Sequence, residues 1–133
     1  KTETPDGNRA AAFVAFARAA EVPARIEVGV LLPRDAQRGT LSGPHLWASF
    51  FVPVLGWVPV DVAQSRRHAD RAAAWFGGAD CDRVVFSSGS EVSFGQAGAP
   101  AGIFFAPYAE VDGKPHAGVQ ADTSFDEESR DDA

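Results

Sequence analysis

The chain has 133 residues, 45% of them hydrophobic and 23% charged, which suits one folded domain with a real core and not a disordered segment. Its longest apolar runs fall well short of the roughly 18 residues that cross a membrane, and nothing in it resembles a signal peptide. The net charge is −6 and no basic stripe is present, which argues against binding to nucleic acid.

The negative charge is concentrated at the C-terminal end. Residues 121–133 contain six acidic residues and one arginine, a net charge of −5, so the rest of the chain is nearly neutral. A short acidic segment of this kind is expected to be solvated and disordered, with a docking tail for a basic partner as the alternative. The expected organisation is therefore one domain over residues 1–120 and a disordered acidic tail over residues 121–133.

Cysteine and histidine usage indicates neither a disulfide nor a cofactor. Cys81 is the single cysteine, and His45, His68 and His116 are too scattered to suggest a zinc site, so we expect no metal and no cofactor. One thiol suits a cytoplasmic protein, which we favour. Export stays open if the chain is a processed piece of a longer protein, since it begins at Lys1 and contains no Met.

The first expected element is a helix over residues 8–20. Its apolar side chains recur at helical spacing, at Phe13, Phe16, Ala17 and Ala20. Asp6 can accept hydrogen bonds from the backbone N–H groups of its first turn, and Pro23 prevents the helix from continuing.

Strands dominate the remainder of the chain. A polar loop over residues 33–43 and a second helix over residues 64–76 interrupt them, and turns are expected at residues 53–56 and at Asp112-Gly113. The expected strands are residues 26–32, 46–52, 57–62, 84–86, 91–94 and 103–111. One helix followed by mainly adjacent strands predicts an α+β fold in which the N-terminal helix packs on an antiparallel sheet.

His45 and Asp61 are the strongest candidates for chemistry. His45 opens one expected strand and Asp61 closes the next, so pairing across the turn brings them to the same end of the sheet. A carboxylate that binds one imidazole nitrogen fixes the tautomer and leaves the other nitrogen to act as a base, as in a nucleophilic triad. The alternative is that both are ordinary solvated residues at strand ends.

Four segments, in the same order along the chain, resemble bacterial transglutaminase-like proteins. Residues 13–25 (FVAFARAAEVPAR) are similar to the family's F-x-A-L-A-R-A-x-G-I-P-A-R, and residues 45–61 resemble its H-x-W-x-E followed by G-W-x-P-x-D. Residues 80–89 (DCDRVVFSSG) resemble D-x-N-R-V-x-F-S-x-G, and residues 104–113 resemble an F-x-x-P-Y-x-E-V-D-G ending. The resemblance spans residues 6–114.

The resemblance implies a papain/transglutaminase-like fold with a truncated N-terminal lobe. In that family a Cys at the start of the first helix attacks an amide, and His and Asp complete the triad. By position, His45 is the base and Asp61 its orienter, while Asp6 stands where the family has the Cys. A carboxylate there is a feeble nucleophile. Asp6 is expected either to pair with His45, holding the imidazole protonated, or to act as a plain helix cap.

Other departures from the family pattern also argue against turnover. Glu21 stands where the family has Gly after the helix, Ser49 replaces the Glu of H-x-W-x-E, and Ser88 and Ser90 replace two basic positions. Cys81 lies between Asp80 and Asp82, whose charges disfavour a thiolate, so we expect a structural or incidental thiol there.

The tryptophans of the two strands are candidates for core packing, and one of them also for substrate binding. Trp47 and Trp57 are expected to face the core of the sheet. Trp47 could instead bind substrate by forming the wall of a groove beside His45.

The predicted function is that of a catalytically silent binding or scaffold module whose partner is a peptide or protein. The alternative is a cysteine-type amide hydrolase or transamidase, protease-like, whose nucleophile lies in sequence missing from this chain. No nucleic-acid or membrane partner is expected. An exposed sheet edge would also allow a homodimer.

Overall fold

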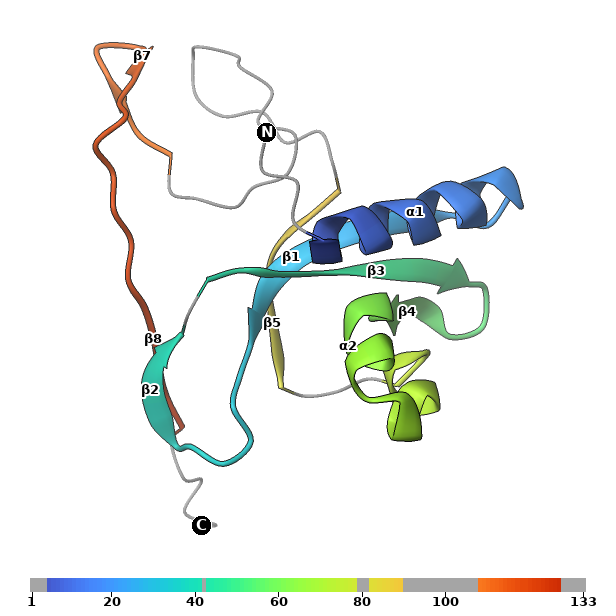
Figure 1. The fold of residues 1–133 in the computed structure, drawn as a ribbon. Coiled ribbons are helices and arrows are strands. Elements are labelled where there is room, and N and C mark those ends of the chain that lie inside the picture. The colour runs from blue at the N-terminus through green and yellow to red at the C-terminus, as the bar shows by residue number, and fades with distance from the viewer. Residues whose placement is uncertain (1–4, 42, 79–81, 90–107, 128–133) are drawn as a thin grey trace.

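A computed structural model describes residues 5–41, 43–78, 82–89 and 108–127, with side chains from residue 7 onward. The chain starts with a helix and continues mainly as strands (Figure 1). The elements are α1 (Pro5–Ala19), β1 (Ala24–Leu31), β2 (Arg38–Leu41), β3 (His45–Val52), β4 (Gly56–Val60), α2 (Val62–Arg67), the 3-10 helix η1 (Ala69–Trp75), β5 (Arg83–Ser88), β6 (Glu110–Val111), β7 (Lys114–Pro115) and β8 (Thr123–Asp126).

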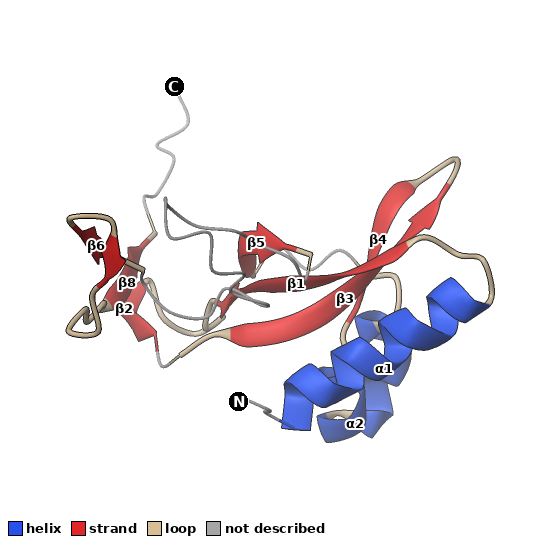
Figure 2. Cartoon of the chain, turned by 90° about the horizontal axis from the view of Figure 1, so that it is seen from above, coloured by secondary structure: helices blue, strands red, loops and turns tan. Residues whose placement is uncertain are grey.

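The central sheet has four strands in the order β4-β3-β1-β5, and neighbouring strands are antiparallel. Both helices lie on one side of this sheet (Figure 2). Helix α1 contributes Ala10 and Val14 to a buried apolar cluster, and the sheet contributes Ala24, Ile26, Val28, Leu46 and Ala48. The predicted α+β class, with an N-terminal helix packed on an antiparallel sheet, is therefore confirmed.

Helix α1 ends in a left-handed residue. Glu21 has φ 61°, its N–H donates to the carbonyl of Arg18, and the N–H of Val22 donates to the carbonyl of Ala17. This pattern of a six-residue and a four-residue hydrogen-bonded turn closes many helices, and the left-handed position is usually glycine. The structure thus gives Glu21 the backbone conformation that the family's glycine suggested.

The second helix differs from its prediction because it is shorter and broken. Instead of one helix over residues 64–76, α2 runs from Val62 to Arg67 and η1 follows after His68, whose φ of −124° and ψ of 64° are not helical. The chain turns back on itself, since the N–H of Asp61, just before α2, donates to the carbonyl of Trp75, the last residue of η1, at 2.9 Å.

Two segments without a strand prediction pair with each other. Strand β2 lies in the expected loop over residues 33–43, and β8 lies in the expected disordered tail, so the structure differs from both predictions there. They run antiparallel from Arg38 opposite Asp126 to Leu41 opposite Thr123. The Phe125 ring covers Gly39, where an added Cβ would lie 3.3 Å from it.

The remaining C-terminal predictions are only partly covered by the structure. Strands β6 and β7 form a small hairpin through Asp112 and Gly113, the expected turn, which have φ values of 52° and 72°. The expected strand over residues 91–94, most of the one over residues 103–111, and residues 128–133 lie outside the described residues.

Candidate functional site

The structure brings His45 and Asp61 together. His45 is the first residue of β3 and Asp61 follows the last residue of β4, its antiparallel neighbour. The Nε2 atom of His45 lies 2.6 Å from Oδ2 of Asp61. The side chain of Asp61 is fully buried and that of His45 is 11% exposed. The predicted pairing at one end of the sheet is thus present, and a catalytic role for it stays a prediction.

The carboxylate of Asp61 is fixed from a second direction by α2. Its Oδ1 accepts a hydrogen bond from the N–H of Gln64, at 2.9 Å, which makes Asp61 the N-cap of that helix. Burial alone would raise the pKa of Asp61. The hydrogen bond and charge of His45, the Gln64 N–H and the charge of Arg83 outweigh burial and hold this pKa below its ordinary value.

Arg83 is the site residue that the sequence analysis missed. Its Nη2 lies 3.2 Å from Oδ2 of Asp61, and its side chain is only 6% exposed. The guanidinium carbon lies 5.2 Å from the ring centre of Trp47 and 5.4 Å from that of Trp75. Residues 80–89 were singled out for their resemblance, but an arginine at the start of an apolar strand gives no local sign of where its side chain points.

Trp47 packs against the ring of His45 and does not line the cavity described below. It is 2% exposed, and its ring stacks on that of His45 with centroids 6.0 Å apart. An added Cβ at Gly29 would overlap the carbonyl oxygen of Val84 and lie 2.9 Å from the Trp47 ring, so only glycine fits between them. A substrate-binding role for Trp47 stays a prediction.

Trp57 does not face the core, contrary to the prediction. It is 41% exposed and makes an edge contact with Phe51, its partner across the β3–β4 pairing. The side-chain period of two places both residues on the sheet face opposite α1. Arg25 covers the Trp57 ring from 4.0 Å.

Asp6 is the second residue of α1, and its side chain lies outside the described part of the chain, as does Cys81. Helix α1 and strand β3 pack together and run in the same direction, so both begin toward the same end of the sheet (Figures 1 and 2). The backbone at Asp6 thus lies toward the end of the sheet that carries His45. Contact between Asp6 and His45 stays a prediction.

A cavity of about 290 Å³ opens beside His45. Its wall combines apolar side chains with a hydroxyl, an amide and a guanidinium. The lining residues are Leu31, Pro33, Thr40, Leu41, Gly43, Pro44, His45, Gln64 and Arg67.

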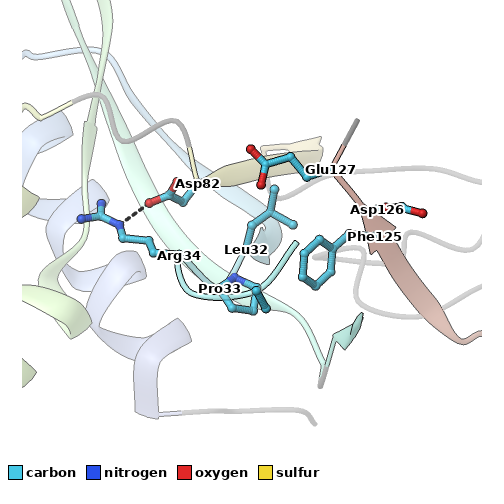
Figure 3. Close-up of a pocket in the computed structure, with 8 residues that line it drawn as sticks. Leu32, Pro33, Arg34, Asp82, Phe125, Asp126 and Glu127 are labelled. Carbon is cyan, nitrogen blue, oxygen red and sulfur yellow. Dashed lines mark hydrogen bonds and ion pairs between the residues drawn. The ribbon is translucent and has the colours of Figure 1, made fainter. Parts of the chain in front are cut away.

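A larger cavity, of about 650 Å³, lies on the other side of the β1–β2 connection, and Pro33 lines both. In Figure 3 the ion pair between Arg34 and Asp82 stands at one side of it and Phe125 at the other. Neither His45 nor Asp61 lines this second cavity.

The described residues contain no group of three or more His, Cys, Asp or Glu side chains arranged to hold a metal ion. Among the helices that the structure describes, none is long and apolar enough to cross a membrane.

Fold and site together define an α+β protein in which an imidazole and a buried, helix-capping carboxylate are hydrogen-bonded at one end of an antiparallel sheet. The family model of the transglutaminase-like superfamily matches residues 5–62, which include the start of α1 and both members of this pair. Over these residues the chain is similar to the transglutaminase-like superfamily. The match covers less than half of the 133 residues. No curated protein and no solved structure matches the chain significantly.

Proposed function

We propose that this chain is a transglutaminase-like domain that retains the base and the orienting carboxylate of a Cys-His-Asp triad, lacks the thiol, and binds a peptide or protein segment without turning it over. The observation that carries the proposal is the contact between Nε2 of His45 and Oδ2 of Asp61, at 2.6 Å and shielded from water. In a triad, such a contact fixes the tautomer of the imidazole.

The contact with Asp61 leaves one nitrogen of the His45 ring for proton transfer. Because Nε2 is held by Asp61, the nitrogen that remains for a proton transfer is Nδ1, which has no hydrogen-bond partner among the described residues. In a cysteine enzyme this nitrogen would take the proton of the thiol. At the family's Cys position this chain has Asp6, whose carboxylate attacks an amide poorly and would give an anhydride as the acyl product.

The cavity beside His45 supports a binding role. Its apolar residues suit side chains of a peptide, while Thr40, Gln64 and Arg67 offer polar contacts for a peptide backbone or an acidic group. We propose a papain-type arrangement in which a bound segment passes His45 on its way over this cavity.

Restoring the nucleophile tests the proposal. In a Cys81→Ser background, Asp6→Cys is labelled with iodoacetamide at about pH 6, with and without His45→Ala. Ala11→Cys, at an exposed position of the same helix, is the matched control. A thiol at the helix start beside an imidazolium has a lowered pKa, so Asp6→Cys should react about tenfold or more faster than Ala11→Cys.

The proposal also requires that His45→Ala removes most of this advantage, and that the parent chain labels slowly through Cys81. Equal rates for Asp6→Cys and Ala11→Cys would mean that the first helix and His45 do not form a triad scaffold. Rapid labelling of the parent chain would move the reactive centre to Cys81.

A second candidate is a cysteine-type amide hydrolase or transamidase whose nucleophile lies in sequence outside this chain. The partial family match favours it, because a partial domain leaves room for the missing residues elsewhere. Sequencing the complete natural transcript discriminates the two candidates. A Gly-x-Cys segment in place of the residues around Asp6 would restore the enzyme, and its absence would support the silent module.

A further inference from the structure

The imidazole of His45 and the guanidinium of Arg83 both contact one oxygen of Asp61. Oδ2 lies 2.6 Å from Nε2 of His45 and 3.2 Å from Nη2 of Arg83. The two nitrogens are therefore within about 6 Å of each other, a range in which one charge strongly affects the protonation of a neighbouring group. The guanidinium is always protonated, so its charge is a permanent part of the site.

The guanidinium of Arg83 makes few hydrogen bonds although it is buried. Its Nε and Nη1 atoms and the Nε1 atom of Trp75 are buried and have no hydrogen-bond partner in the part of the chain that the structure describes. Buried N–H groups without acceptors are destabilising, and more so on a charged group. The guanidinium is held instead by its ion pair with Asp61 and by the faces of Trp47 and Trp75.

Other charged groups also lie near the imidazole or near Arg83. Arg67 of α2 lines the cavity in front of His45, and His68 stacks on the Trp75 ring with centroids 6.0 Å apart. On β1, Glu27 lies opposite Trp47 and is neutralised by Arg25, at 2.7 Å. Arg83 is in ion-pair contact with the carboxylate that holds His45.

We infer that Arg83 is a positioning residue that keeps the Asp61 carboxylate ionised and in place, and that its charge makes the imidazole of His45 release its proton at a lower pH than Asp61 alone would allow. The inference rests on the proposed role of the His45–Asp61 pair but not on the presence of a nucleophile.

The test is an NMR titration of the His45 ring in Arg83 variants of the full chain. Arg83→Met can fill the space between the two tryptophans without a charge, and Arg83→Gln is a second neutral variant. In both, the midpoint of the His45 titration should rise by about 1–2 pH units, since the attraction of Asp61 is no longer opposed. Arg83→Lys, which keeps the charge, should stay near the parent value.

Arg25→Gln is the matched control, because Arg25 also lies over a tryptophan and pairs with a buried carboxylate. It should leave the His45 midpoint unchanged. An unchanged midpoint in a folded neutral variant of Arg83 would overturn the inference. So would neutral variants that fail to fold beside a folded Arg83→Lys, since Arg83 would then be a structural residue.

This outcome is separable from that of the proposed function. Loss of the His45 effect on Asp6→Cys labelling would remove the triad scaffold, whereas the titration reports only the coupling between Arg83 and His45.

Discussion

Two buried carboxylates, of Glu27 and Asp61, are each paired with an arginine that lies over a tryptophan ring. Glu27 is 3% exposed and Asp61 is fully buried. Both oxygens of Glu27 are occupied by side chains that do not titrate near neutral pH, because Arg25 binds Oε1 and the hydroxyl of Ser88 donates to Oε2. One oxygen of Asp61 instead faces a histidine that lines a cavity.

The comparison teaches that a buried ion pair is not by itself a sign of function. The Glu27 network is closed, so its most direct role is to join β1 to β5. The Asp61 network ends in a titratable ring next to open space. That difference, and not burial or charge, marks the second network as the candidate site.

The largest expected effect is the loss of folding stability when the carboxylate of Asp61 is removed. Asp61→Ala should lower the free energy of unfolding by about 3–5 kcal/mol, because Arg83 would be left as an unpaired buried charge and α2 would lose its cap. Urea unfolding measures the loss. The double variant Asp61→Ala/Arg83→Met should recover part of the lost free energy of unfolding. No recovery would show that the unpaired charge of Arg83 is not what destabilises Asp61→Ala.

The stability lost in Asp61→Ala should also depend on pH. The pKa of Asp61 is lower in the folded chain than in the unfolded chain, so its contribution is complete above the unfolded value of about 4 and is lost as the pH falls through the folded-state pKa. The difference in unfolding free energy between the parent and Asp61→Ala should therefore shrink progressively below about pH 4. A constant difference from pH 7 to pH 2 would contradict the assigned ion pair.

A smaller effect is expected in the closed network. Glu27→Gln should cost about 1–2 kcal/mol in urea unfolding, because the side chain of Arg25 is 35% exposed and can be hydrated when its partner loses its charge. Ser88→Ala should cost less than this. Neither variant should alter the His45 titration, and a shift there would mean that the two networks are one.

The smallest effect lies outside both networks. Glu21→Gly should raise the free energy of unfolding by about 0.5–1 kcal/mol, because glycine adopts the left-handed conformation of Glu21 without a Cβ penalty. Thermal unfolding with Glu21→Ala as the control checks this, since alanine keeps the penalty. Equal melting temperatures for the glycine and alanine variants would argue against strain at this helix end.

The features that were predicted correctly depend on local sequence patterns. Helix α1, strands β1, β3 and β4, and the approach of His45 to Asp61 follow from side-chain periodicity and from one tight turn. Arg83 was not predicted, because its partner Asp61 is distant in the chain and the β1–β5 pairing that brings them together includes a register shift at Val28 and Gly29.

The pairing of β2 with β8 was missed for the same reason. Each strand has only four residues and little apolar character, so neither carries a signal apart from its partner. For Trp57, aromatic content predicted burial, but the sheet face that receives it is partly open.

The carboxylate of Asp61 connects the candidate site to helix α2. Its two oxygens have separate duties, since Oδ2 holds the imidazole and Oδ1 holds the N–H of Gln64. A rotation of the Asp61 carboxylate that breaks both contacts would expose the Gln64 N–H and free the imidazole together. Hydrogen exchange at Gln64 should therefore measure how often this carboxylate leaves its place in the site.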